Sequence, residues 1–163
     1  MFKADCSTDN YETPIAVWRQ LLPYVKQYKT IVDPFYCDGR ARIYWEDLGK
    51  KCKHSDIDAY SITNDFPPDH CIVTNPPFSQ LEKAITFLFS FDNAIFCLVP
   101  ISILNSDWFV ELLHKAEEYR EFSILPAVVR TGFIKDGALL RESPTALCII
   151  SLGVANGKRK RRE

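Results

Sequence analysis

The sequence predicts a single α/β domain with a mostly parallel central sheet, and three observations support this prediction. Apolar, β-branched runs of strand length alternate with amphipathic stretches of helix length. Turn residues follow several of the apolar runs and lead directly into a helical pattern, as they do in strand–loop–helix units. The chain has 163 residues and 47% hydrophobic content, enough for one well-buried core and too few for two full domains. We therefore expect one domain over residues 1–154, followed by a basic tail over residues 155–163.

The first strand–helix unit spans residues 30–48. Residues 30–33 (Thr-Ile-Val-Asp) predict a short buried strand, a turn runs to Gly39, and residues 40–48 predict a helix. Such a unit binds nucleotides, because the helix N-terminus presents free backbone N–H groups beside the strand end. Gly39 would let the backbone approach a ligand closely.

A second strand is predicted within residues 51–60 and ends in acidic residues. Asp58 follows Gly39 by about 20 residues, the spacing at which a dinucleotide-binding fold places a carboxylate on a ribose hydroxyl. Asp56 is an equally good candidate, and Asp65 is a rival for a second acidic contact. The alternative for each carboxylate is an ordinary solvated loop position.

The next strand, residues 71–74 (Cys-Ile-Val-Thr), runs directly into residues 75–78 (Asn-Pro-Pro-Phe). Two prolines fix their own φ angles and push Asn75 away from α geometry, so the backbone is held before any ligand arrives. The Asn75 side-chain oxygen and the Pro76 carbonyl can both accept hydrogen bonds from one amino group, and Phe78 can stack on the attached ring. Residues 79–82 have the spacing of a capping box and predict the start of a helix at Ser79.

The remaining elements continue the alternation. An apolar helical stripe covers residues 81–89, a buried strand covers residues 94–99, and a second stripe covers residues 108–116. Residues 122–125 and 145–152 supply the last strands. Only about 40 residues separate Asp33 from Asn75, where a full nucleotide-binding α/β fold of this kind usually has two strand–helix units. Because each parallel crossover needs a dozen or more residues, we expect a sheet that lacks one strand or helix of that fold.

Near the N-terminus, Thr13 and Pro14 have two readings. Thr13 is a good N-cap and Pro14 a good first residue for an amphipathic helix over residues 15–22. Because Thr-Pro helix starts are common, the sequence favours this capping role. The second reading follows from a family resemblance.

Residues 11–14 (Tyr-Glu-Thr-Pro), residues 33–39 (Asp-Pro-Phe-Tyr-Cys-Asp-Gly), the acidic residues and residues 75–78 occur in the order of the motifs of N6-adenine methyltransferases. Over residues 9–150 the chain resembles this family, and it looks closest to its compact phage and viral members. The resemblance implies a Rossmann-like methyltransferase fold with an antiparallel closing strand. It also implies S-adenosylmethionine as the cofactor and the exocyclic amino group of adenine as the methyl acceptor.

The family motifs assign roles to residues of this chain. In the resemblance Asp33 meets the amino end of the methionine moiety, and Cys37 stands where the family most often has a glycine. The catalytic residues that it implies are Asn75, Pro76, Pro77 and Phe78. The cofactor-binding residues that it implies are Tyr11, Thr13, Pro14, Asp33, Pro34, Phe35, Cys37, Gly39, Asp56 and Asp58.

Several alternatives remain open at this point. DNA is the favoured substrate and RNA the alternative; a protein glutamine methyltransferase also uses Asn-Pro-Pro with an aromatic residue. A further alternative is a non-catalytic subunit of the same fold, which binds nucleic acid or a catalytic partner. We expect residues 100–106 and 130–141 to form the walls of the substrate crevice, although both segments also read as surface loops.

Cysteines and histidines indicate no metal site. The six cysteines include no C-x-x-C pair and several lie in apolar runs, so we expect reduced, buried thiols in an intracellular protein. His54, His70 and His114 lack ligand spacing with them, and His70 is expected in a loop. No apolar run approaches the roughly 20 residues needed to span a membrane, and the N-terminus lacks a signal-peptide pattern.

A run of positive charges lies at the C-terminus. Residues 158–162 are all Lys or Arg, and the rest of the chain carries more acidic than basic residues. Nucleic-acid-binding proteins usually show a basic surface, and the tail is the obvious candidate for it here. The alternatives are a nuclear localisation signal, which would change the expected location from cytoplasm to nucleus, and a tail with no function.

Overall fold

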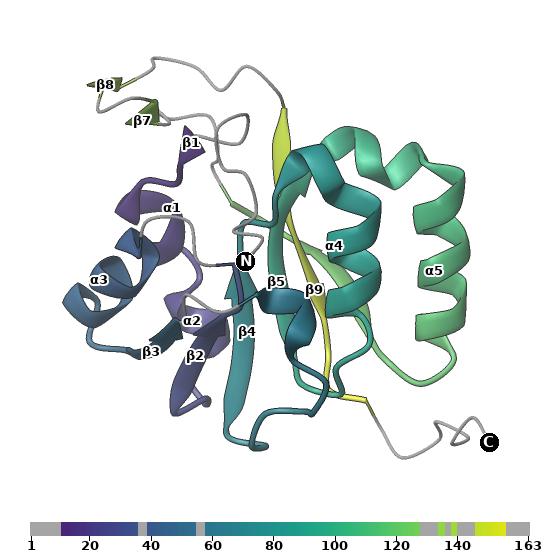
Figure 1. The fold of residues 1–163 in the computed structure, drawn as a ribbon, viewed down its shortest axis with the longest axis horizontal. Coiled ribbons are helices and arrows are strands. Elements are labelled where there is room, and N and C mark those ends of the chain that lie inside the picture. The colour runs from purple at the N-terminus through teal and green to yellow at the C-terminus, as the bar shows by residue number, and fades with distance from the viewer. Residues whose placement is uncertain are drawn as a thin grey trace.

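The structure of the protein is a computed structural model, and it describes residues 11–35, 39–54, 58–127, 134–135, 138–139 and 146–155. Its centre is a six-stranded sheet with the order β3-β2-β4-β5-β9-β6 (Figure 1). The strands are β2 (Thr30–Asp33), β3 (Lys51–His54), β4 (His70–Thr74), β5 (Ile95–Pro100), β6 (Phe122–Leu125) and β9 (Leu147–Leu152). The first four are parallel, and β9 is antiparallel to both of its neighbours. The predicted α/β architecture with an antiparallel strand near its closing edge is therefore confirmed.

A second, three-stranded sheet has the order β1-β7-β8. Its strands are β1 (Tyr11–Glu12), β7 (Ile134–Lys135) and β8 (Ala138–Leu139), all antiparallel. The chain leaves β1 through Thr13 and enters the first helix. This small sheet therefore joins a segment close to the N-terminus to one more than 120 residues later.

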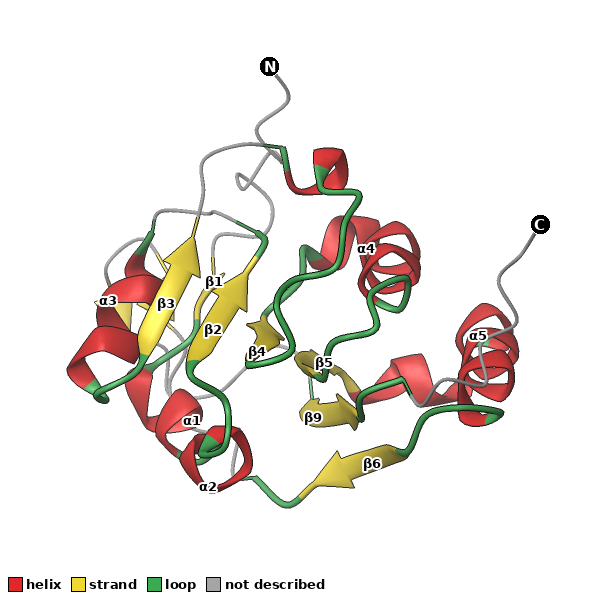
Figure 2. Ribbon diagram, turned by 90° about the horizontal axis from the view of Figure 1, so that it is seen from below, coloured by secondary structure: helices red, strands yellow, loops and turns green. Residues whose placement is uncertain are grey.

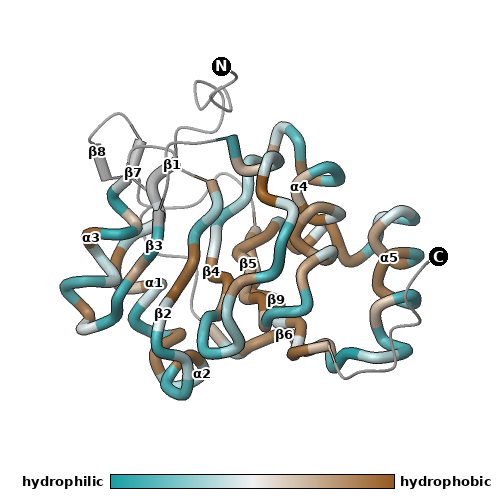
Figure 3. Tube along the Cα trace, turned by 60° about the horizontal axis from the view of Figure 1, so that its bottom comes forward, coloured by the Kyte–Doolittle hydropathy of each residue, from teal (hydrophilic) through white to brown (hydrophobic). Residues whose placement is uncertain are grey.

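Helices cover both faces of the large sheet (Figure 2). On one face α1 (Ile15–Arg19), α2 (Leu22–Val25) and α3 (Arg40–Asp47) pack on β2 and β4 through a core that includes Trp18 and Trp45. On the other face α4 (Leu81–Leu88) and α5 (Asp107–Glu117) cover β4, β5 and β9. The buried strands β4, β5 and β9 are the hydrophobic centre of the molecule (Figure 3). No helix in the described ranges combines the length and the apolar character needed to cross a membrane.

The sheet is trimmed as predicted. The connection from β3 to β4 contains, in its described part, only the 3-10 helix η1 (Ala59–Ser61) in place of an α-helix. Aromatic rings fill this side of the sheet. The Tyr60 ring lies 5.1 Å from that of Phe87 and 5.9 Å from that of Phe35, both in edge contact. A cluster of aromatic side chains thus covers the sheet face where a crossover helix would otherwise pack.

Three local predictions are wrong. The helix expected over residues 15–22 is two short helices, α1 and α2. The helix expected at Ser79 begins at Leu81, after the 3-10 helix η2 (Phe78–Gln80), and its N-cap Gln80 makes no side-chain cap bond. His70 is the first residue of β4 and is buried, because its neighbours Thr30 and Cys71 belong to the core ladder of β2 and β4.

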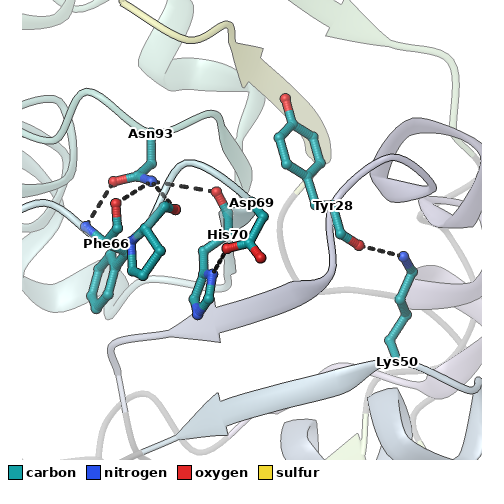
Figure 4. A network of polar contacts seen from close by, with 7 residues as sticks. Tyr28, Lys50, Phe66, Asp69, His70 and Asn93 are labelled. Atoms are coloured by element: carbon teal, nitrogen blue, oxygen red, sulfur yellow. Dashed lines mark hydrogen bonds and ion pairs between the residues drawn. The ribbon is translucent and has the colours of Figure 1, made fainter.

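At the amino-terminal ends of the parallel strands, which we call the amino-terminal edge of the sheet, polar side chains connect neighbouring loops by hydrogen bonds (Figure 4). The Asn93 side chain accepts a hydrogen bond from the Phe66 N–H at 3.0 Å. Its Nδ2 donates to the carbonyls of Phe66, Pro67 and His70 at 3.1–3.3 Å. On the other side of this edge, Lys50 Nζ donates to the Tyr28 carbonyl at 2.7 Å. Asn93 therefore holds the loop before β4 against the start of β5.

Candidate active site

The carboxyl ends of β2 and β4 bring Asp33 and Thr74 together. Because β2 and β4 are adjacent and parallel, the residues that end them meet at the same edge of the sheet. Thr74 Oγ1 donates a hydrogen bond to Asp33 Oδ1 at 2.6 Å, and the Phe35 N–H donates to the same oxygen at 3.2 Å. Asp33 is 5% exposed. The carboxylate is thus buried and held in one orientation at the predicted ligand-binding edge.

Asn75 follows Thr74 and presents its amide at the same edge. Its Nδ2 donates to Thr13 Oγ1 at 3.0 Å, a contact that spans 62 positions of the sequence. Its Oδ1 is buried, and among the described residues it has no hydrogen-bond partner. A buried acceptor without a partner costs about 1–3 kcal/mol, and such groups are rare in folded proteins. Asn75 Oδ1 is therefore a buried acceptor that no described residue satisfies.

Thr13 belongs to this site rather than to a helix cap. The residue at the N-cap of α1 is Pro14, and no side-chain cap bond forms there. Thr13 is 5% exposed, and its hydroxyl accepts the hydrogen bond from Asn75. The capping role that the sequence favoured is wrong, because the partner of Thr13 comes from a distant strand and not from the helix that follows it.

The prolines after Asn75 set the path of the chain. Pro76 is buried, and Pro77 has an extended backbone at φ −64° and ψ 118° before η2 begins at Phe78. Phe78 is partly exposed. Beyond it an open groove of about 960 Å³ runs along η2 and α4, with Tyr60, Gln80, Lys83 and Phe87 among its lining residues. Along the chain, Phe78 thus falls between Asn75 and the residues of η2 and α4 that line this groove.

Gly39 has a backbone conformation that favours glycine. It is the N-cap of α3 with φ 80°, in the left-handed region where a side chain is strained. Pro34 and Phe35 are buried, and the Phe35 ring belongs to the aromatic cluster. Cys37 lies outside the described residues.

The acidic candidates separate into two groups. The Asp58 side chain is exposed and accepts a hydrogen bond from the Tyr60 N–H at 3.1 Å, which caps η1. Asp56 lies outside the described residues. Asp65 accepts a hydrogen bond from the Asp92 N–H at 2.8 Å, in the loops that precede β4 and β5. Asp65 is therefore at the edge opposite Asn75, which leaves Asp56 and Asp58 as the candidates for a ribose contact.

The predicted crevice walls are placed only in part. The segment over residues 100–106 forms the 3-10 helix η3 (Ile101–Asn105) directly after β5, at the same edge as Asn75. Of residues 130–141, the structure describes β7 and β8. β7 pairs with β1, so that Tyr11 lies opposite Lys135. This pairing brings a predicted cofactor motif and a predicted wall of the crevice together.

The described cysteines are buried or half-buried free thiols. Burial raises the pKa of Cys71 to about 12 and raises the pKa values of Cys52 and Cys97 further. A thiol that stays protonated is a poor nucleophile and a poor metal ligand. Within the described ranges, no group of three His, Cys, Asp or Glu side chains is placed to hold a metal ion.

No protein family matches the chain, and no curated protein matches it. Among solved structures, a Listeria monocytogenes protein matches with a TM-score of 0.49 and 12% identity. Its name assigns it provisionally to the class I S-adenosylmethionine-dependent methyltransferases. The alignment covers 93% of this chain and 63% of that protein, so this chain spans less than two thirds of its neighbour's length.

Proposed function

We propose that the protein is an S-adenosylmethionine-dependent methyltransferase that methylates the exocyclic N6 amino group of adenine in nucleic acid, with DNA as the favoured substrate. The observation that carries the proposal is the buried Oδ1 of Asn75, which has no hydrogen-bond partner in the described part of the chain, together with the buried carboxylate of Asp33. The Asn75 oxygen fits a hydrogen bond from a neutral amino group, and the Asp33 carboxylate fits a positively charged one. The order of the sequence motifs is the second support.

Asn75 is proposed to orient the target amino group. The lone pair of an adenine amino group is delocalised into the ring, which makes the nitrogen a poor nucleophile. Two hydrogen bonds from that group, to Asn75 Oδ1 and to the Pro76 carbonyl, would draw the nitrogen toward tetrahedral geometry and direct its lone pair. Phe78 would stack on the base, which must leave the helical stack if the substrate is a duplex.

Thr13 determines which end of the Asn75 amide is available. Since Asn75 Nδ2 is bound to Thr13 Oγ1, the oxygen end of the amide is the end left for a ligand. An amide free to rotate by 180° would present a donor to the substrate half of the time. Thr13 is therefore proposed as a positioning residue that acts through Asn75.

The residues around β2 fit the proposed cofactor. A buried carboxylate held by two donors, as at Asp33, suits the ammonium of the methionine moiety. The left-handed Gly39 allows the backbone to approach a ligand, and Asp56 or Asp58 would hold the ribose. When bound, S-adenosylmethionine supplies the methyl group on its sulfonium sulfur.

The charge distribution favours approach of nucleic acid from the side of α1–β3. Described residues between 11 and 54 contain eight Lys and Arg against four Asp and Glu. Between residues 58 and 127 there are three Lys and Arg against ten Asp and Glu. A polyanion is attracted to the first region and repelled by the second. Lys51 and Lys53, exposed on the edge strand β3, are the proposed phosphate contacts.

The first experiment measures transfer of labelled methyl groups from S-adenosylmethionine to unmethylated DNA, RNA and protein pools, with nucleoside analysis of the products. We expect N6-methyladenine in DNA. Asn75→Ala should lower the rate by about 10²–10³-fold, the effect of losing one well-placed hydrogen-bonding group. Calorimetry should show unchanged cofactor binding.

Asn64→Ala is the matched control, because Asn64 is exposed and adjoins Asp65, which lies at the edge opposite Asn75. Equal transfer by Asn75→Ala and the wild type would contradict the proposed role of Asn75. Label in RNA or in glutamine of protein would replace the substrate and keep the chemistry. Absence of both transfer and cofactor binding would indicate a non-catalytic subunit.

The proposed nucleic-acid surface has its own test. Reversing charge in the double variant Lys51→Glu, Lys53→Glu should weaken DNA binding about tenfold or more at low salt and reduce the salt dependence of the binding constant by about two phosphate contacts. Truncation after Gly157 tests the basic tail in the same titration. A salt slope that changes only on truncation would assign the contacts to the tail instead.

A further inference from the structure

We propose that the edge strand β6 pairs with β6 of a second copy of the chain, so that the two sheets join across a two-fold axis. The proposal concerns a surface away from the candidate active site and does not depend on the function proposed for that site. It rests on the contrast between the two edges of the sheet and on the hydrogen-bonding register of β6.

The two edges of the large sheet differ in charge. At one edge β3 exposes Lys51 and Lys53, and lysine on an edge strand opposes pairing with another chain. At the other edge β6 has the sequence Phe-Ser-Ile-Leu, without a charged residue, and Ile124 is 51% exposed. Figure 2 shows β6 at the margin of the sheet, at the opposite end from β3. Only the β6 edge is therefore suited to pairing.

The register identifies which backbone groups of β6 remain available. The Gly153 N–H donates to the Glu121 carbonyl at 2.8 Å, so odd-numbered residues of β6 bond to β9. On β9, the Ile101 N–H bonds to the Ala146 carbonyl, so even-numbered residues of β9 face β5 and odd-numbered ones face β6, in agreement. The N–H and C=O groups of Phe122 and Ile124 therefore point away from β9, at an edge where no described strand pairs with them.

These four groups are self-complementary. In an antiparallel pair, Phe122 lies opposite Ile124 of the partner subunit, and the reverse pair forms by symmetry with Ser123 on the axis. Phe122 packs against the core under α5, with its ring 6.2 Å from that of Phe109. Ile124, two positions on, shares this face of the sheet and would be covered by the partner.

The flanking residues permit this register. Glu121 falls opposite Leu125 of the partner subunit, so no two like charges face one another. Pro126, which has no N–H, lies just beyond the paired residues and limits the pairing to this short segment. The contact is isologous, as in most two-fold dimers, and closes on itself without leading to a fibre.

The geometry keeps the two candidate active sites independent. β6 is antiparallel to β9 and therefore runs in the same direction as β2–β5. Antiparallel pairing of two β6 strands reverses this direction in the second copy. The strand ends that carry Asn75 in the two copies then face in opposite directions, and the contact covers neither of them.

The experiment that tests the pairing is disulfide trapping on the axis. Residues opposite one another in a non-hydrogen-bonded antiparallel pair have Cα atoms about 4.5 Å apart, within the span of a disulfide. Ser123→Cys should therefore give a covalent dimer under mild oxidation. Ser61→Cys, at an exposed position on η1, is the matched control, and the wild type sets the background of the native cysteines.

Sedimentation equilibrium over a range of concentrations gives the association constant. We expect dimerisation of the wild type, and weakening by tenfold or more in Ile124→Lys, which places a charge opposite Phe122 of the partner subunit. Ile43→Lys is the control, since Ile43 on α3 is 55% exposed and lies outside the contact. Ile124→Thr serves in its place if the lysine variant does not fold.

Two results would overturn the proposal. One is a wild-type monomer at every concentration, with no more crosslinking of Ser123→Cys than of Ser61→Cys. The other is a dimer whose association is equal in the wild type and the Ile124 variants, which would assign the contact to another surface.

Discussion

The amino-terminal and carboxyl-terminal ends of the parallel strands use polar side chains in opposite ways, and two asparagines make the comparison direct. At the amino-terminal edge Asn93 is 6% exposed and uses its oxygen once and its nitrogen three times, always with backbone groups. At the carboxyl-terminal edge Asn75 uses only its nitrogen, and its buried oxygen has no partner among the described residues. A saturated amide holds loops together, whereas an unsaturated one is available to a ligand.

The same contrast extends to the charged groups. Arg120 is 4% exposed near the amino-terminal edge and donates to three backbone carbonyls, those of Phe91, Asn93 and Gly153, at 2.5–2.7 Å. At the other edge the buried Asp33 carboxylate accepts hydrogen bonds from the Phe35 N–H and from Thr74 Oγ1. We infer that stability is concentrated at the amino-terminal edge and binding at the carboxyl-terminal edge. The following substitutions test this division, beginning with the largest expected effect.

Arg120→Ala should lower the free energy of unfolding by about 4 kcal/mol. The substitution removes the side-chain donor from three backbone carbonyls, and it also removes the packing contacts of a buried side chain. Urea denaturation measures the change. Arg42→Ala is the control, since Arg42 makes an exposed ion pair with Glu46 at 2.9 Å, and should cost only about 0.5 kcal/mol. Similar losses in the two variants would refute the special role of Arg120.

Asn93→Ala and Asn75→Ala compare the two edges with the same substitution. Asn93→Ala removes four hydrogen bonds to buried backbone groups and should cost about 3 kcal/mol in urea denaturation. Asn75→Ala removes one hydrogen bond and also an acceptor that no described residue satisfies. These two changes have opposite effects on the free energy of unfolding, so the net change should stay within about 1 kcal/mol. A greater loss for Asn75→Ala than for Asn93→Ala would reverse the comparison.

The smallest effect is expected at Asp69. The hydrogen bond from His70, at 2.6 Å, holds the pKa of Asp69 below its ordinary value of 3.8. A depressed carboxyl pKa stabilises the fold above the ordinary pKa, and this contribution is lost as the pH falls through the lowered value. The free energy of unfolding should therefore fall less steeply in Asp69→Asn than in the wild type as the pH is lowered from about 5 toward the acid transition. The exposed Asp47→Asn serves as the control, and a parallel acid limb in the wild type and Asp69→Asn would contradict the coupling.

Much of the fold could be predicted because its signals are local. The strands β2, β4 and β5 are buried along their whole length and mostly apolar, as expected of strands covered on both faces. The shortened crossover followed from chain length alone, since too few residues separate Asp33 from Asn75 for a second strand–helix unit. What the count did not predict is the aromatic cluster around Tyr60 that covers the gap.

The errors occurred where a local pattern competed with a distant contact. Thr13 fits a helix N-cap, but its hydroxyl binds Asn75 from another strand. Ser79 fits a capping box, yet the chain first makes a 3-10 turn after the rigid prolines, so the helix begins at Leu81. Asp65 follows the acidic strand end in sequence, but its carboxylate caps the loop before β5.

The amino-acid sequence alone predicts an α/β fold in which Asp33 ends one strand and Asn75 follows the end of its parallel neighbour. Hydrophobic periodicity and turn residues act within a few positions of the chain, and parallel connectivity then brings the strand ends to one edge. Only the tertiary structure decided that Thr13 binds the nitrogen of the Asn75 amide, that its oxygen is left buried without a described partner, and that Asn93 at the opposite edge is saturated. Hydrogen bonds between distant segments depend on how the elements pack, and no local pattern in the sequence specifies that packing.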